Sequence, residues 1–164
     1  MNTLDELLAH DIRISVQEVF RAYLSMDAQP GPVRIKPRGQ PYVPPDTEIL
    51  AVVGYGGGIK GGIHLASPVH VACTLSGAFA GMELETMDDT ARDAFGELAN
   101  MVAGGVQSRL MDQHGFDEIV LTPPMVFSGI HHGMTYKKDF SSVRHYFKFA
   151  GGLFFLECFY IPDD

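Results

Sequence analysis

The segment "EILAVVGYGGGIKGGIHLAS", residues 48 to 67, places two apolar, β-prone runs on either side of a glycine cluster. Such runs are typical of strands, and the glycines supply the positive φ that a tight reversal needs. The segment therefore predicts a β-hairpin. Residues Gly56 to Gly61 also satisfy G-x-G-x-x-G, the dinucleotide-binding pattern. That pattern must open a helix after a strand, whereas a second apolar strand follows here, so we favour the hairpin.

The C-terminal part of the chain is also rich in predicted strands. They are "DEIVLTPPMVFSG" (117–129), "GMTYKKDF" (133–140), "VRHYFKFA" (143–150) and "LFFLECFYI" (153–161). Gly151 and Gly152 join the last two as a tight hairpin. We interpret the aromatic residues of this hairpin as core or as a dimer seam rather than as a stacking platform. Because hairpins outnumber strand-helix-strand units, the sheet should be largely antiparallel.

Three helices are expected to cover this sheet. The first spans residues 4–26, with an apolar face formed by Ile12, Val16, Val19, Phe20 and Tyr23. In the second, Ser67 is the N-cap, Pro68 the first helical residue and Gly81 the residue past the end. The third begins after Asp88 or Asp89, runs to about Gln113 and is closed by Gly115. The predicted fold class is α+β, a largely antiparallel β-sheet covered by long helices.

The length of 164 residues and the 46% hydrophobic content suit one domain, 1–164. Within it, residues 27–47 are a proline-rich connector, because six prolines between Pro30 and Pro45 exclude a helix or a central strand. A short edge strand at Val33 to Lys36 remains compatible with them. Arg34, Lys36 and Arg38 form either a solvated loop, which we favour, or a small anion-binding patch.

Charge and cysteine content exclude several classes of partner. The net charge of −8 disfavours nucleic acid and anionic membranes, both of which need a basic face. The N-terminus "MNTLDELLAHDIR" does not resemble a signal peptide, and no apolar run is long enough to span a membrane, so we expect a cytoplasmic protein. Cys73 and Cys158 are expected to be buried free thiols, with a single disulfide as the alternative.

Neither the histidines nor the serines form a recognisable catalytic pattern. Adjacent His131 and His132 would point to opposite faces of a strand, and the apolar surroundings of His64, His70 and His145 favour core histidines over metal ligands. We therefore predict no bound metal. Three serines considered as nucleophiles lack a G-x-S-x-G context: Ser67, Ser76 and Ser128.

The third helix carries the most informative polar residues. With about 100° of rotation per residue, one side holds the core stripe of Phe95, Leu98, Ala99, Val102, Val106 and Leu110. The opposite side groups Asp93, Glu97, Asn100 and Gly104. Composition alone makes this an ordinary solvated face. Gly104, however, leaves a flat position where the backbone of another molecule can approach closely.

The stretch "DAFGELANMVAGG", residues 93–105, resembles the signature of the CheX and CheC family of chemotaxis phosphatases. That signature is Asp or Ser, Glu four residues on, Asn three further and Gly four further. The segments "GGIKGGIHLASP" and "LTPPMVFSG" are similar to the corresponding family segments, and the similarity spans about residues 10 to 160. The single motif favours a CheX-like, one-site protein with a CheC-like fold.

The resemblance implies a substrate and a mechanism. The substrate would be the phospho-aspartate of a CheY-like response regulator. Glu97 would pair with the regulator's lysine and Asn100 would orient the attacking water, while Asp93 and Gly104 would contact the partner. Mg²⁺ would belong to the regulator, and this chain would bind no cofactor of its own.

Two further expectations follow from the same resemblance. The alternative function is a CheX-like binding or scaffold module that docks on a signalling protein without catalysis. A homodimer is also expected, because CheX relatives pair through their sheets and the C-terminal hairpins offer edges that would otherwise be exposed.

Overall fold

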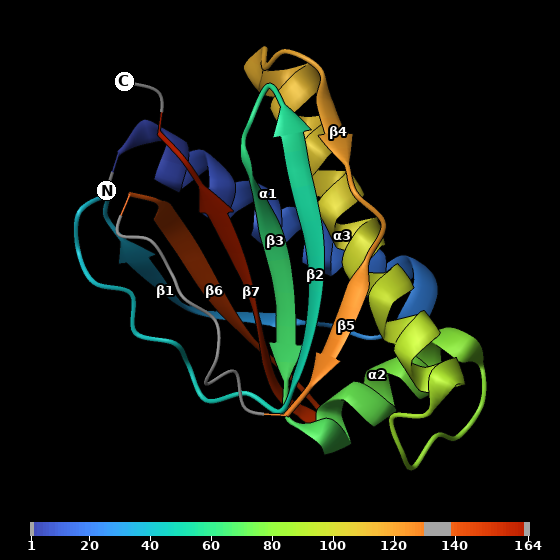
Figure 1. The fold of residues 1–164 in the computed structure, drawn as a ribbon. Coiled ribbons are helices and arrows are strands. Elements are labelled where there is room, and N and C mark those ends of the chain that lie inside the picture. Colours follow the sequence, from blue (N-terminus) through green and yellow to red (C-terminus); the bar gives the residue numbers. More distant parts are fainter. Residues whose placement is uncertain (1, 130–138, 163–164) are drawn as a thin grey trace.

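One antiparallel sheet organises the computed structural model, which describes residues 2–129 and 139–162 (Figure 1). Its strands are β1 (Gln29–Lys36), β2 (Ile49–Gly57), β3 (Gly61–Ser67), β4 (Ile119–Leu121), β5 (Met125–Ser128), β6 (Ser141–Phe149) and β7 (Gly152–Tyr160). Their order is β1-β6-β7-β3-β2-β4, and β5 also pairs with β2. Every pairing is antiparallel, so the predicted α+β class is confirmed.

The predicted hairpin at residues 48–67 is confirmed as β2 and β3, with Val53 opposite Ile63. The glycines are needed where the chain reverses. Gly57 has φ +81°, and a Cβ added there would lie 2.3 Å from Glu118 O. A side chain is therefore excluded by both backbone conformation and space.

The C-terminal hairpin is confirmed as β6 and β7, but its predicted exposed edges are wrong. β1 pairs with β6 and β3 pairs with β7, so the hairpin lies inside the sheet. The prediction did not pair the edge strand expected at Val33 to Lys36 with this hairpin, whereas β1 covers the outer edge of β6. Most of the strand predicted at "GMTYKKDF" lies outside the described residues.

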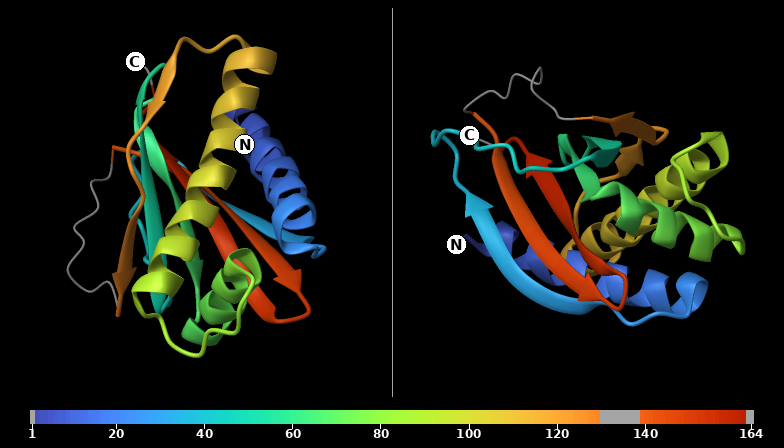
Figure 2. Two further views of the ribbon diagram at one scale, coloured as in Figure 1. Left: turned by 90° about the vertical axis from the view of Figure 1, so that its right-hand side faces the viewer. Right: turned by 90° about the horizontal axis from the view of Figure 1, so that it is seen from below.

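Two long helices, α1 (Thr3–Val19) and α3 (Asp89–His114), cover one face of the sheet (Figure 2). A capping box between Asn2 and Asp5 begins α1. The first helix is shorter than predicted, because residues Phe20–Leu24 form a π-helical turn that ends at Ser25 with φ 51°. The wider turn rotates Tyr23 away from the core, so its predicted place there is wrong and its side chain is 54% exposed.

The short helix α2 (Val69–Ala80) follows β3 directly and ends at Gly81 as predicted. Its predicted N-cap, Ser67, is wrong: Pro68 occupies the cap position, and the Ser67 hydroxyl donates to Pro68 O. Glu48 takes over the capping role, since its Oε1 accepts from Val69 N at 3.1 Å. A residue distant in sequence therefore caps this helix.

No helix of the described residues lies on the other face of the sheet, which is crossed by residues 37–48 (Figure 1). We call this segment the strap. The predicted edge strand before it is confirmed and extends back to Gln29, with an irregularity between Pro30 and Val33. Lys36 donates to Phe140 O and lies 4.0 Å from the centre of the Phe140 ring. This lysine therefore makes contacts within the chain, and the anion-binding alternative stays a prediction.

Both cysteines are buried and free, as predicted, so the alternative of a disulfide between Cys73 and Cys158 is wrong. Burial in the core raises the pKa of Cys158 to about 12. Its thiol is therefore inert at neutral pH. Among the described residues, no helix is long and apolar enough to cross a membrane.

Candidate functional site

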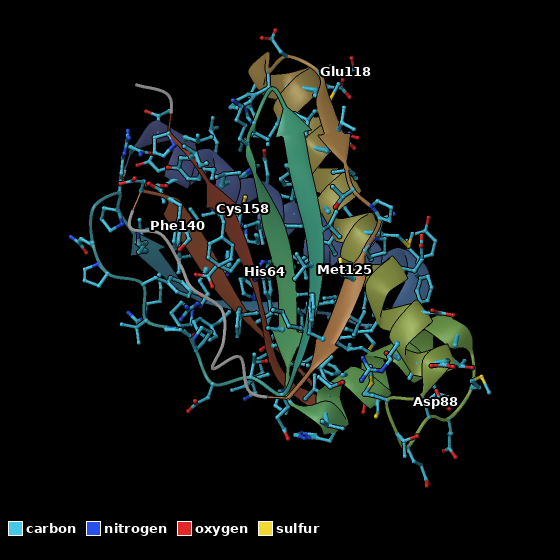
Figure 3. The ribbon with its side chains drawn as sticks, in the orientation of Figure 1. His64, Asp88, Glu118, Met125, Phe140 and Cys158 are labelled. Atoms are coloured by element: carbon cyan, nitrogen blue, oxygen red, sulfur yellow. The ribbon has the colours of Figure 1, made fainter. Side chains whose placement is uncertain are left out.

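Helix α3 is capped at both ends, and its buried stripe determines the direction in which its polar face points. Asp88 caps its start by accepting from Ala91 N at 2.9 Å, and Gly115 ends it with φ 70°, both as predicted. Figure 3 labels Asp88, the N-cap of this helix, and Glu118, which lies beyond its C-cap and just before β4. The predicted core stripe is confirmed, since the following residues are all at most 1% exposed: Phe95, Leu98, Ala99, Val102, Val106 and Leu110.

Two polar contacts hold the middle of α3 against the strands. Tyr55 of β2 donates its hydroxyl proton to Ala103 O at 2.7 Å, and Gln107 Nε2 donates to Ile119 O at 2.5 Å. Tyr55 is 5% exposed, and burial raises its pKa well above the ordinary value. The Tyr55 hydroxyl therefore stays protonated at neutral pH and can donate to Ala103 O, so this hydrogen bond connects α3 to β2.

The four predicted site residues share the face of α3 that points away from the core. Asp93 and Glu97 are exposed, while Asn100 and Gly104 are half-buried. Residues three and four apart are neighbours on a helix surface, so the four form one continuous row. The structure thus brings the predicted residues together on one accessible face, and it leaves their chemical roles as predictions.

The adjacent glycines Gly104 and Gly105 differ in their surroundings. A Cβ added at Gly104 would have no heavy atom within 4 Å. A Cβ added at Gly105 would lie 2.8 Å from Ser15 Oγ and 3.0 Å from Ser15 Cβ, where α1 and α3 approach each other. Packing within the chain therefore accounts for Gly105 but not for Gly104.

A hollow of about 390 Å³ lies beside this row, between α3 and the chain entering β5. Asp93 and Glu97 form part of its wall, and Pro124 and Val126 form the opposite side. Gly96 lets the two sides approach, because a Cβ there would lie 3.3 Å from Val126 Cγ2. The polar face consequently continues into a concave surface.

Arg92 closes this hollow, and the sequence patterns did not single it out. Its guanidinium donates to Met87 O at 3.2 Å and to Val126 O at 3.3 Å, and also to Ser128 Oγ. These bonds tie the start of α3 to β5, an edge strand. The only sequence feature that could have drawn attention to Arg92 is its position next to Asp93. Helical spacing does not reveal its hydrogen-bond partner Val126, which lies 34 residues away.

The other sequence candidates show no catalytic arrangement. Ser128 accepts from Arg92, and the Ser76 hydroxyl is buried without a hydrogen-bond partner. His64 and His145 are buried as expected, whereas His70 is exposed, contrary to the expectation of an apolar setting. Burial lowers the pKa of His145.

No metal cluster is found in the part of the chain that the structure describes. Nowhere in residues 2–129 and 139–162 do three His, Cys, Asp or Glu side chains group in a way that would hold a metal ion. His131 and His132 lie outside these residues. The absence of a bound metal therefore stays a prediction.

Comparisons with known proteins agree with the fold and with the motif. A family model described as "Chemotaxis phosphatase CheX" matches residues 49–148. The CheY-P phosphatase CheX of Thermotoga maritima is 30% identical over 127 residues, which cover 77% of this chain and 78% of that protein.

Solved structures share the architecture of this chain. A CheC-like superfamily protein from Shewanella sp. PV-4 has a TM-score of 0.77 at 24% identity, covering 97% of this chain and 99% of that one. A chain of the CheX-CheY-BeF3-Mg²⁺ complex from Borrelia burgdorferi has a TM-score of 0.76 at 17% identity, covering 93% and 97%. These likenesses define a protein with the CheC-like fold. The chain belongs to the CheX family of chemotaxis phosphatases, which confirms the resemblance drawn from its third helix.

Proposed function

We propose that this protein hydrolyses the phospho-aspartate of a CheY-like response regulator. The observation that carries the proposal is the exposed row of Asp93, Glu97, Asn100 and Gly104 on a firmly held helix of a CheX-family chain. The relative from Thermotoga maritima is a CheY-P phosphatase, and the Borrelia burgdorferi structure is a CheX-CheY complex. Both support the same class of partner here.

Each residue of the row has a role suited to its chemistry. The Asn100 amide, which can both donate and accept, would hold a water in line with the acyl phosphate. Glu97 would pair with the regulator's lysine and thereby orient the helix on the partner. Gly104 would allow close approach, and Asp93 would contact the partner from the edge of the hollow. An acyl phosphate is already activated, so positioning replaces a strong general base.

Mg²⁺ would be held by the regulator's own acidic pocket, and this chain would supply no cofactor. Exposed carboxylates at Asp93 and Glu97 would then face the partner's lysine without competing for the ion. The hollow closed by Arg92 would receive a surface loop of the regulator next to its phosphorylated aspartate. The affinity for the phosphorylated regulator would therefore come mainly from the hollow, and the rate of hydrolysis would depend mainly on Asn100.

The test is the lifetime of a phosphorylated receiver domain in Mg²⁺ with and without this protein. We expect Asn100→Ala and Glu97→Ala to lose activity by at least about 100-fold, the size typical of losing a positioning group. Gln113→Ala and Asp112→Ala are matched controls, because both side chains are exposed on the same helix. Tight binding with an unchanged phosphate lifetime would instead establish the non-catalytic binding module.

We also propose a homodimer that uses a free edge of the sheet. Among the described residues, the outer strands of the sheet are β1 on one side and β4 with β5 on the other. Arg92 already occupies the outward carbonyl of Val126, which leaves β1 as the more accessible edge. Light scattering at micromolar concentration should give twice the chain mass, and a monomer would refute the proposal.

A further inference from the structure

A cavity of about 420 Å³ is lined in part by residues of the strap. The strap crosses the face of the sheet opposite α3 (Figure 2). The floor of the cavity is a row of paired residues from three adjacent strands: Ala66 is opposite Phe155, and Phe155 is opposite Tyr146. Pro45 of the strap and Leu153 of β7 also belong to the apolar lining. The volume and lining are those of a small-molecule pocket.

The strap is held over this cavity by a buried network rather than lying loosely on the surface. Glu157 is 2% exposed and accepts from the Tyr42 hydroxyl at 2.8 Å and from Arg144 Nε at 3.0 Å. Arg144 Nη2 also donates to Val43 O at 3.4 Å. The network places the guanidinium of Arg144 in the wall of the cavity.

Two hydrogen-bond donors in the cavity wall remain available. Arg144 Nη1 donates one of its two protons to the Tyr146 hydroxyl at 3.3 Å, and that hydroxyl donates to no acceptor among the described residues. The other hydroxyls of the lining are used internally: Thr47 shares its one hydroxyl proton between Ile49 O and Ser67 O, and Ser67 donates to Pro68 O. A ligand atom near Tyr146 would therefore meet two donors.

The charges of the residues around the cavity determine which hydrogen-bond acceptor a ligand should carry. Arg144 is already paired with Glu157, and Asp46 also lines the cavity, so no positive charge is left uncompensated. A ligand carboxylate would add a buried negative charge, whereas a neutral carbonyl would use the same donors without that cost. We propose that this cavity binds a small neutral molecule with an apolar body and a carbonyl group, such as an amide.

In the bound arrangement the carbonyl oxygen accepts from the Tyr146 hydroxyl and from Arg144 Nη1. The apolar body packs on Phe155, Ala66 and Leu153. Leu153 is 59% exposed, so burial under the ligand removes apolar surface from water. The site is separate from the phosphatase face and does not depend on the proposed function.

Hexanamide and hexanoate are suitable probes, since they share the alkyl chain and the carbonyl carbon but carry a neutral amide and a charged carboxylate head group, respectively. Methyl and amide NMR spectra of the full chain should show saturable shifts at Ala66 and Leu153 with hexanamide and weaker binding of hexanoate. Tyr146→Phe should weaken hexanamide binding about fivefold, the value of one neutral hydrogen bond. Ala66→Val should abolish it by filling the cavity, while Tyr23→Phe, a distant exposed tyrosine, should have no effect.

Three results would overturn the proposal. Equal or tighter binding of hexanoate would refute the neutral ligand class. Hexanamide binding that keeps its wild-type affinity in both Tyr146→Phe and Ala66→Val, with both variants folded, would place the ligand elsewhere. Absence of shifts, together with a dimer that Leu153→Glu disrupts, would show that a second copy covers the cavity.

Discussion

Neighbouring glycines on α3 allow packing and function to be separated at single positions. A Cβ added at Gly104 would have no heavy atom within 4 Å, so an alanine there would cause no clash. It would also lower the conformational entropy that the chain loses at this position on folding. Gly104→Ala should stabilise the protein by about 1 kcal/mol in urea unfolding. The same methyl group would keep the regulator away, so the phosphatase rate should fall at least about tenfold.

Gly105→Ala is the matched control for that variant. Its Cβ would contact Ser15, so the substitution should destabilise the fold by about 1 kcal/mol despite the better helix propensity. Its kcat should stay near that of the wild type. Loss of activity in both variants alike would contradict a special role for Gly104.

Acid stability provides a second test at the level of a residue. Burial lowers the pKa of His145 below its ordinary 6.5, and nearby Arg13 adds to the shift. Below about pH 6.5 the unfolded chain therefore binds more protons at this site than the folded chain does, and stability falls with falling pH. His145→Phe keeps the stacking on Phe147 and should flatten the decline between pH 6.5 and the folded-state pKa. An unchanged slope would exclude His145 as a source of the decline.

At the scale of elements, Arg92 connects the motif helix to an edge strand. It donates to Val126 O and Ser128 Oγ, so Arg92→Ala should loosen β5 against α3. Amide hydrogen exchange in β5 should accelerate about fivefold or more, the equivalent of one lost hydrogen bond of about 1 kcal/mol. The KM for the phosphorylated regulator should rise while kcat changes little.

The control for Arg92→Ala is Arg21→Ala. Arg21 pairs with Asp27, and both side chains are largely exposed, at 70% and 82%. A surface pair of this kind contributes little, so exchange in β5 and the KM should both stay unchanged. A fall in kcat alone for Arg92→Ala would instead indicate that the arginine acts on the reacting groups.

At the scale of the whole molecule, the Arg144–Glu157 pair joins the strap to the centre of the sheet. Their side chains are 14% and 2% exposed, and removing one partner leaves an uncompensated charge. Glu157→Gln should therefore cost about 3 kcal/mol in urea unfolding. Limited proteolysis should also cut the strap sooner, because Tyr42 loses the carboxylate that it binds.

A double substitution separates charge from packing at this site. Arg144→Met with Glu157→Leu should be more stable than either single variant, since no buried charge is left unpaired. Glu18→Gln, which breaks the more exposed pair with Arg109, should cost no more than about 1 kcal/mol. Additive effects of the two single variants would contradict coupling between Arg144 and Glu157.

Local patterns were sufficient to predict most of the elements. The glycines between β2 and β3, the cap at Asp88 and the stop at Gly115 act over a few residues, and their outcomes match the prediction. The orientation of α3 also follows from helical periodicity alone. The four-residue row was predictable for that reason, although periodicity says nothing about its chemistry.

The predictions that failed depend on contacts between distant segments. Glu48 caps α2 from 21 residues away, and a π-helical turn rotates Tyr23 out of the core. The C-terminal hairpin became internal because β1, rich in proline, pairs along the edge of β6. No local pattern reports these pairings.

By itself, then, the sequence determined the hairpins, the helix ends and the row of Asp93, Glu97, Asn100 and Gly104, because each rests on short-range geometry. Only the tertiary structure decided the strand order, the hollow closed by Arg92 and the cavity beneath the strap. These features arise where segments more than 30 residues apart meet, as Arg92 meets Val126 and Tyr42 meets Glu157. The strand order, the hollow and the cavity depend on packing between distant segments. The periodicity of apolar residues within one segment does not specify which distant segment it will contact.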